Sequence, residues 1–160
     1  MVINAQLKGG LALRQKWISI KNGTLKQADK KFKIFKNNPE FTLGLGLYLA
    51  EGTKTSTVSI VNLDYRALKI FVDWCKKWLN GKKFSTRLRI APDMDESKAK
   101  KWWKNRLGIK PKWSKTQFMS ITGKTSSEYA NQYGLCRVTL IDCIYAREKV
   151  MRWIDLYCQR

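Results

Sequence analysis

The spacing of apolar and polar residues along the chain predicts an alternation of strands and helices. Residues 84–90 alternate strictly between an apolar set and a polar set that includes Arg87 and Arg89, which predicts a strand with a core face and a cationic face. Three further strands are predicted over residues 57–63, 117–122 and 136–140. Helices are predicted over residues 65–79, 97–107 and 144–157, where apolar residues recur at helical spacing.

Local signals give the expected ends of these helices. Asp64 is expected to cap the helix over residues 65–79. Asp93 and Glu96 form a capping box for the next helix, and Gly108 is expected to end it. The last helix is expected to bury Ile144, Val150, Ile154 and Tyr157.

Four strands with helices packed on one face make an α+β layer. The other face of such a sheet is polar and positively charged in this chain. Its expected residues are Ser85, Arg87, Arg89, Arg137 and Thr139.

Residues 43–52, LGLGLYLAEG, form an apolar stretch that predicts a helix ending in a single carboxylate, Glu51. A glycine inside a helix costs about 1 kcal/mol relative to alanine, so close approach of a second helix is expected to compensate for it. Small residues spaced four apart on one face allow two helix axes to come close. The expected interface consists of Leu43, Gly46, Leu47 and Ala50. Gly52 is expected to end the helix in a left-handed conformation.

A second helix with the same residue would bring two Glu51 carboxylates together. Two like charges so close need a divalent cation between them, and oxygen ligands suit magnesium or calcium. The expected metal ligands are Glu51 and the adjoining Gly52. The alternative is a buried helix in which a terminal glutamate has no chemical role.

Residues 1–40 are expected to form a basic helical appendage to one domain over residues 41–160. A short helix is predicted over residues 11–20, and Asn22 with Gly23 signals a turn after it. A second helix is indicated by a face that contains Leu25, Ala28, Phe32 and Phe35. Three interpretations remain open: a helix-turn-helix, a solvated basic arm and a helical brace.

Charge is the main compositional signal. The 160 residues include 32 basic and 12 acidic ones, and the resulting net charge of +20 is spread along the whole chain. A basic surface of that size indicates a polyanionic partner, and nucleic acid fits it better than a membrane does. No apolar run is long enough for a transmembrane helix, and the first residues lack a signal-peptide pattern. We therefore expect a protein of the cytoplasm, nucleoid or an organelle matrix that is not secreted.

The chain contains no histidine, which excludes Ser-His and Cys-His catalysis and histidine-bound metals. Its four cysteines lack Cys-x-x-Cys spacing, so free thiols are expected in place of a zinc site. Acid–base or metal chemistry must then rest on carboxylates, lysines or tyrosines.

The stretch over residues 43–52 resembles the signature helix of the LAGLIDADG homing endonuclease family. The identical positions are Gly46, Leu47, Ala50 and Gly52. Glu51 stands where the family carries its metal-binding Asp or Glu, whereas Leu49 replaces an earlier acidic position. The resemblance extends, at the level of pattern, over residues 41–157. It implies a saddle-shaped, four-stranded antiparallel sheet with helices on one face and the signature helix at a dimer interface.

The resemblance also implies a function. The chain has one copy of the signature, so two-carboxylate chemistry requires a homodimer that cuts a pseudo-palindromic DNA duplex. The implied reaction is hydrolysis of phosphodiester bonds with Mg²⁺ as cofactor, and with Ca²⁺ or Mn²⁺ as substitutes in vitro. The family places a basic residue near the scissile phosphate, for which Lys115 is the first candidate and Lys54 the second. For each of them, the alternative is a surface lysine that only contacts phosphate, and this alternative is favoured over the catalytic role.

The sheet of the family lies in the DNA major groove, where arginine reads guanine and glutamine reads adenine. The expected DNA contacts are Ser85, Arg87, Arg89, Lys115, Gln117, Lys124, Arg137 and Thr139. Two other functions remain open. One is a non-cleaving binder on the same fold, either a DNA-binding regulator or a splicing cofactor that holds intron RNA. The other is a small basic structural protein such as a ribosomal component, in which Glu51 has no role.

Overall fold

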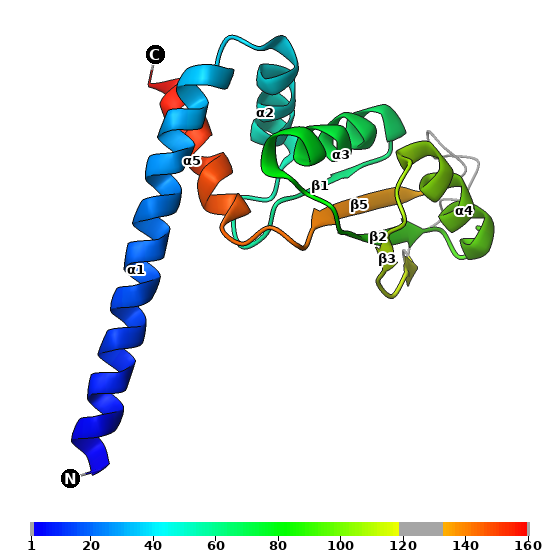
Figure 1. Cartoon of the computed structure of the whole chain (residues 1–160). Coiled ribbons are helices and arrows are strands. Elements are labelled where there is room, and N and C mark those ends of the chain that lie inside the picture. Colours follow the sequence, from blue (N-terminus) through cyan, green and yellow to red (C-terminus); the bar gives the residue numbers. More distant parts are fainter. Residues whose placement is uncertain (1, 119–132, 160) are drawn as a thin grey trace.

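The structure is a computed structural model that describes residues 2–118 and 133–159. The body of the molecule has two layers, a twisted sheet and a layer of helices, and a long first helix runs past one end of it (Figure 1). This arrangement confirms the expected α+β class.

The sheet is mixed, and its described part has five strands, which corrects the expected four-stranded antiparallel sheet. Three antiparallel strands lie side by side in the order β1 (Ser59–Asn62), β5 (Leu135–Leu140) and β2 (Phe84–Ile90). Two short strands, β3 (Lys112–Trp113) and β4 (Gln117–Phe118), pair with β2 in the parallel direction. Parallel pairing follows because the chain crosses over through helix α4 (Glu96–Leu107) before it meets β2 again.

The alternation predicted for the central strands is confirmed. In β2 the apolar positions are buried and Arg87 and Arg89 are exposed. In β5, Cys136 and Val138 are fully buried and Arg137 is exposed. The strand predicted over residues 57–63 corresponds to β1, and only the first two residues of the strand predicted over residues 117–122 are described, as β4.

Helices α2 (Pro39–Glu51) and α3 (Tyr65–Leu79) cover one face of the sheet (Figure 1). They approach closely because Gly44 lies against Trp74, and a Cβ at Gly44 would fall 2.0 Å from the nearest indole atom. The Trp74 indole N–H donates to the Phe41 carbonyl at 3.0 Å. The cost of one glycine in α2 is therefore compensated inside a single chain.

The cap predicted for α3 is confirmed, because the Asp64 carboxylate accepts a hydrogen bond from the Arg66 backbone N–H at 2.8 Å. The cap predicted for α4 is wrong. Asp95, and not Asp93, caps that helix by accepting from the Lys98 backbone N–H at 3.0 Å. Gly108 ends α4 in a left-handed conformation as expected.

Residues expected to form two helices form one, α1 (Val2–Phe35). Asn22 and Gly23 lie inside it, and the Thr24 hydroxyl donates back to the Ile20 carbonyl at 3.0 Å. The helix-turn-helix interpretation is therefore wrong.

The C-terminal half of α1 packs along the last helix, α5 (Ala146–Cys158). The Trp153 indole N–H donates to the Ala28 carbonyl at 3.0 Å, and Arg152 forms a two-pronged ion pair with Asp29 at 2.6 and 3.0 Å. These contacts join α1 to the hydrophobic core, in which a cluster of aromatic rings is formed by Phe35, Phe41, Trp74, Trp78 and Trp153. The structure thus favours the helical brace among the interpretations of this segment.

Two residues that were expected to be buried by the last helix are exposed. Val150 and Ile154 are buried as expected. Ile144 precedes α5 and is 76% exposed, and Tyr157 is 43% exposed, so the expectation that they are buried is wrong. Helix α5 begins at Ala146, later than predicted, because Tyr145 adopts a left-handed conformation at the N-cap.

Candidate nucleic-acid interface

The face of the sheet opposite α2 and α3, called here the open face, carries the arginines predicted to contact DNA. Arg87 on β2 lies directly opposite Arg137 on β5, and Val61 on β1 is the next partner across the sheet. Arg89 follows on β2, beside Gln117 on β4. Pairing across neighbouring strands places these side chains on one surface, because directly opposed residues point to the same side of a sheet.

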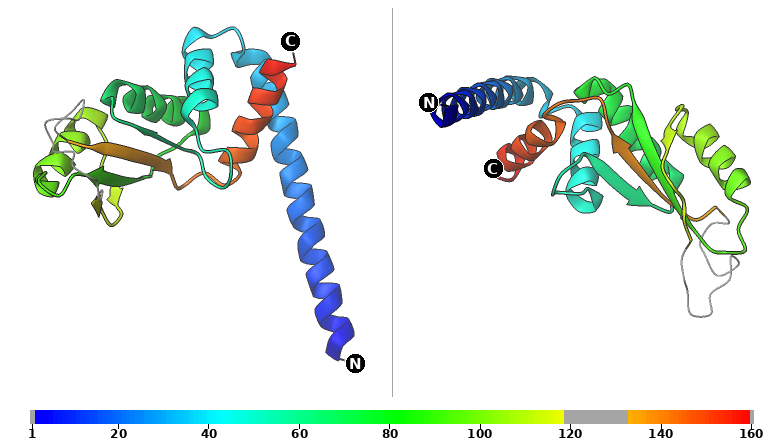
Figure 2. Two further views of the ribbon diagram at one scale, coloured as in Figure 1. Left: turned by 180° about the vertical axis from the view of Figure 1, so that it is seen from behind. Right: turned by 90° about the horizontal axis from the view of Figure 1, so that it is seen from below.

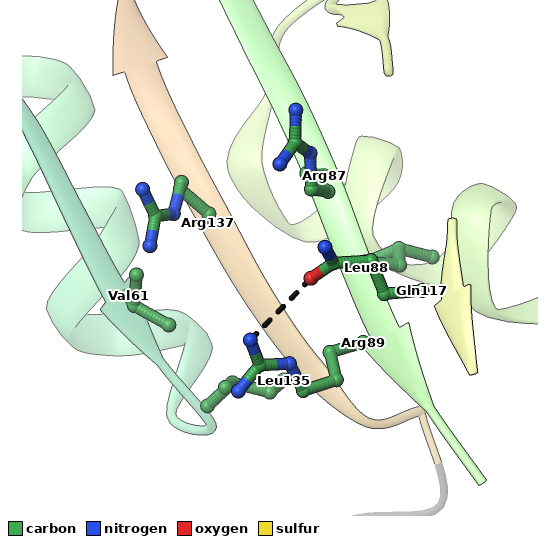
Figure 3. A pocket seen from close by; sticks show the side chains of 7 residues that line it. All are labelled: Val61, Arg87, Leu88, Arg89, Gln117, Leu135 and Arg137. Atoms are coloured by element: carbon green, nitrogen blue, oxygen red, sulfur yellow. Dashed lines mark hydrogen bonds between the residues drawn. The ribbon is translucent and has the colours of Figure 1, made fainter. Parts of the chain in front are cut away.

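The arginines line a shallow groove of about 170 Å³ on this face (Figure 3). Its lining consists of Val61, Arg87, Leu88, Arg89, Gln117, Leu135 and Arg137, with no carboxylate among them. The only hydrogen bond drawn within the lining joins Arg89 Nη2 to Gln117 Oε1 at 3.4 Å, which is long (Figure 3). Arg87 and Arg137 therefore occupy directly opposed positions on β2 and β5, and no described residue of the lining carries a carboxylate.

Like charges directly opposite each other destabilise a sheet. A groove with three arginines and no carboxylate costs folding free energy unless an anion occupies it. An arginine fork matches phosphate oxygens and the guanine edge, so this donor set is chemically suited to an anion of that kind.

A glycine shapes one end of the groove. Gly134 precedes β5 with a φ of 70°, and a Cβ there would lie 2.6 Å from the Arg89 carbonyl oxygen. Only glycine allows the chain to enter β5 so close to the backbone that carries Arg89.

The remaining predicted DNA contacts are Ser85, Thr139, Lys115 and Lys124. Ser85 and Thr139 oppose each other on the open face, where Ser85 Oγ is 3.1 Å from Ser114 Oγ. Lys115 is exposed between β3 and β4. Lys124 lies outside the described residues. Lys112 was missed by sequence reasoning: it is exposed and pairs with Ser85, but its strand has only two residues and gives no alternation to detect.

The end of α2 holds the predicted catalytic carboxylate. Glu51 is the last helical residue and is exposed, and Gly52 forms a β-bridge with Ile60 at the edge of the sheet. Gly52 has φ −76° and ψ 148°, so the predicted left-handed stop is wrong. Glycine is needed there for another reason, because a Cβ would lie 2.4 Å from the Tyr48 carbonyl oxygen.

Lys54 neutralises the carbonyl-rich end of α2. Its ammonium donates to the carbonyls of Leu49 at 2.6 Å, Gly52 at 2.7 Å and Tyr48 at 3.1 Å. A cation in this place offsets the partial negative charge of the helix C-terminus, where Glu51 adds a further negative charge. The predicted catalytic role of Lys54 stays a prediction, and the structure gives its ammonium an additional structural role.

One face of α2 is uncovered in the single chain. Three residues of the predicted dimer interface, Leu43, Gly46 and Ala50, are exposed on it, whereas Leu47 is half-buried against the core. None of the four is charged. Leu43 is 57% exposed, and a Cβ built on Gly46 meets no atom within 4 Å. No contact in the described part of the chain therefore explains Gly46, unlike Gly44.

Few groups could hold a metal ion. Among the described residues there is no cluster of three or more Asp, Glu, His or Cys side chains. One chain offers the Glu51 carboxylate and the Gly52 carbonyl, and the latter already accepts from Lys54. Burial raises the pKa of the Cys75 and Cys136 thiols, so these two cysteines stay protonated and unreactive.

A comparison of the chain with models of protein families finds no match, and searches among curated proteins and solved structures find none either. The resemblance to LAGLIDADG endonucleases therefore stays a hypothesis that rests on the residues themselves. In the described part of the chain, no helix combines the length and apolar character required to cross a membrane.

Proposed function

We propose that this chain is a homodimeric, magnesium-dependent DNA endonuclease of the LAGLIDADG homing type that binds duplex DNA on the open face of its sheet. The observation that carries the proposal is the groove in which Arg87, Arg89 and Arg137 lie together with no carboxylate in the lining. Arginine pairs with phosphate and with the guanine edge, and Gln117 in the same lining suits adenine. The major groove of DNA admits a β-ribbon, so antiparallel β2 and β5 can present these side chains to base edges.

The uncovered face of α2 supports a homodimer. It is apolar, contains no charge and includes Gly46, whose missing side chain leaves room for a second backbone. Two chains related by a two-fold axis through this face would bring their Glu51 residues to the same end of the interface. A symmetric dimer would also join two open faces into one longer surface, which fits a pseudo-palindromic target.

The same geometry suits a metal ion that two copies share. Magnesium is usually held by one or two carboxylates, with the remaining ligands from phosphate and water. Glu51 of each copy would supply the carboxylates, and Gly52 would supply a carbonyl after release of the Lys54 ammonium. A magnesium ion so held would activate water and stabilise the leaving oxygen. Lys115, which is exposed beside the open face, is the first candidate for a basic residue near the scissile phosphate.

One observation favours a second candidate function. Lys54 already places a cation on the carbonyls at the end of α2, so that end is electrostatically satisfied without a metal. A non-cleaving DNA-binding regulator, or a splicing cofactor that binds intron RNA, would use the open face in the same way and would not need Glu51.

The test is incubation with a library of duplexes, with and without Mg²⁺, over a range of salt concentrations. We expect Mg²⁺-dependent cleavage of a pseudo-palindromic site. We also expect a loss of roughly 10³–10⁵ in affinity between 50 and 200 mM salt, if 6–10 phosphates are contacted. Binding without cleavage at any metal concentration would favour the second candidate. A salt dependence close to zero would contradict nucleic-acid binding altogether.

A further inference from the structure

The N-terminal half of α1 extends away from the body of the protein (Figures 1 and 2). The ring of Trp17 lies 6.2 Å from that of Tyr145 at the start of α5, near the place where the helix leaves the body. Beyond this contact, residues 2–16 continue as helix for about 22 Å, given a rise of 1.5 Å per residue. Residues 10–21 are called here the arm.

The arm lies on the side of the sheet that the open face looks toward. Helices α2 and α3 lie on one side of the sheet. Helix α1 ends near α2, and its N-terminal end lies past the level of the sheet, toward the other side (Figure 1). In the view from below, α5 lies between α1 and the strands, and the N-terminal end of α1 lies at the far end of the molecule (Figure 2). A duplex that lies on the open face and extends past α5 would therefore reach the arm.

The charges of the arm are unneutralised. Between residues 10 and 36 the chain has eight basic residues and one acidic residue, Asp29, which Arg152 already neutralises. Arg14, Lys16 and Lys21 are exposed, and none of the three takes part in an ion pair within the described part of the chain. Arg14 and Lys16 lie on the part of α1 that projects beyond the Trp17–Tyr145 contact, and Lys21 lies on the other side of it. Three exposed cations without a described ion-pair partner indicate an anionic partner.

The apolar side chains of the arm raise the question of a second copy. Leu11 and Ile18 are 59% and 50% exposed and continue, at heptad spacing, the stripe formed by half-buried Leu25 and buried Phe32, of which Phe32 contacts Tyr157 of α5. Arg14 and Lys21 occupy the positions between them. Two arms packed along this stripe would bring these cations together with no acidic residue of the arm to offset them, which disfavours a helix pair.

We propose that the arm is a second DNA contact, which binds the phosphate backbone beside the segment held on the open face. This inference rests on the proposed function, because it requires duplex DNA on the sheet. Arg14, Lys16 and Lys21 bind phosphates, and the exposed Trp17, Leu11 and Ile18 give apolar contact with the sugars. Such contacts carry no sequence information, so the arm adds affinity and orientation and leaves specificity to the sheet.

The experiment compares two triple variants of the full chain. The arm variant carries Arg14→Gln, Lys16→Gln and Lys21→Gln. The control variant carries Lys26→Gln, Lys30→Gln and Lys33→Gln, three exposed positions on the half of the same helix that packs on α5. Both lose the same charge from the same helix. The measurements are the slope of log affinity against log salt for a mixed-sequence duplex, and the hydroxyl-radical footprint.

We expect the arm variant to reduce the slope by about 0.9 for each phosphate contact removed and to shorten the footprint at its outer edges. The control variant should change both much less. Equal effects of the two variants would attribute the loss to net charge and overturn the proposal, as would an unchanged slope in the arm variant.

Two further measurements distinguish this proposal from the proposed function and from an interface between two copies of the chain. If Arg87→Gln with Arg137→Gln abolishes duplex binding but the arm variant does not weaken it, the arm proposal fails and the proposed function stands. If the wild type binds no duplex, both fail. If Leu11→Gln with Ile18→Gln converts a dimer to a monomer and leaves the salt slope unchanged, the arm is an interface between copies and the proposal is overturned.

Discussion

Arg87 and Arg137 are direct cross-strand partners on β2 and β5, and none of the described residues that line their shared groove carries a carboxylate. Directly opposed like charges destabilise a sheet by an amount comparable to what opposite charges contribute, roughly 0.2–1 kcal/mol. We predict that Arg137→Gln raises the free energy of unfolding by an amount in that range. The same change should weaken duplex binding and reduce the salt slope by about 0.9 if one phosphate contact is lost. Lys76→Gln on α3, on the covered side of the sheet, is the control and should leave binding unchanged.

Glu51 should be needed for cleavage and not for binding. Glu51→Gln keeps the shape of the side chain and removes the anionic metal ligand, so cleavage should fall by orders of magnitude while duplex affinity stays equal or rises. Stability should rise by about 0.3–1 kcal/mol, because a carboxylate at a helix C-terminus opposes the helix dipole. Glu40→Gln removes the same charge from the first turn of the helix and should leave cleavage intact. Equal cleavage by wild type and Glu51→Gln would place the active site elsewhere.

Gly46 should matter only for the dimer. A Cβ at position 46 meets no described atom of its own chain within 4 Å, and leucine is a better helix former by up to about 1 kcal/mol, so the Gly46→Leu monomer should be at least as stable as the wild type. The dimer should dissociate, because a large side chain would lie where two backbones meet. Sedimentation velocity and thermal melting measure the two effects. A wild type that is monomeric even on DNA would contradict the dimer.

Gly44 provides the opposite case on the same helix. Gly44→Ala places a Cβ against the Trp74 indole, so it should destabilise the monomer itself by roughly 1–3 kcal/mol. Circular dichroism during urea unfolding gives this value.

Thr86 is a buried residue whose hydroxyl has no hydrogen-bond partner among the described residues. Because a buried unsatisfied polar group costs roughly 1–3 kcal/mol, Thr86→Val should stabilise the fold by about 1 kcal/mol. Thr116 is the matched control: its hydroxyl donates to the Glu96 carboxylate at 2.5 Å, so Thr116→Val should destabilise instead. The same sign for both variants in urea unfolding would show that the hydroxyls do not decide the outcome.

The junction of α1 and α5 should be sensitive to acid. The hydrogen bonds from Arg152 hold the pKa of Asp29 below its usual value of 3.8. The folded state therefore binds the proton more weakly than the unfolded state, so this contribution to stability is present above pH 4 and is lost as pH falls through the folded pKa. Asp29→Asn should be less stable than wild type at pH 7, and the difference should shrink below pH 3.8. A difference that is independent of pH would assign the effect to packing.

Local signals account for the parts of the fold that sequence reasoning predicted. The alternation in β2 is readable because side-chain direction has a period of two and one face is buried. The Asp64 cap is readable because its bond spans two residues. The turn predicted at Asn22 and Gly23 is wrong, because these residues lie inside α1. Packing on α5 stabilises α1, and no local pattern around residue 22 reveals that packing.

The candidate site likewise has features that local patterns predict and features that depend on long-range contacts. The outward direction of Arg87 and Arg137 follows from local alternation, but their direct opposition depends on the register between β2 and β5, which is a long-range property. The contacts of the Lys54 ammonium depend on how the segment after Gly52 folds back on α2. Lys112 became visible only through its pairing with β2.

The bond from the Trp153 indole to the Ala28 carbonyl joins residues separated by 125 positions. During translation α1 therefore emerges long before the helix on which it rests. Until α5 leaves the ribosome, Ala28 lacks the Trp153 side chain that covers it in the fold, and Phe32 has Phe41 of α2 but lacks Tyr157 of α5. A nascent chain of this protein must keep its first helix from aggregating until α5, the last described helix, is made, and only then can the core close.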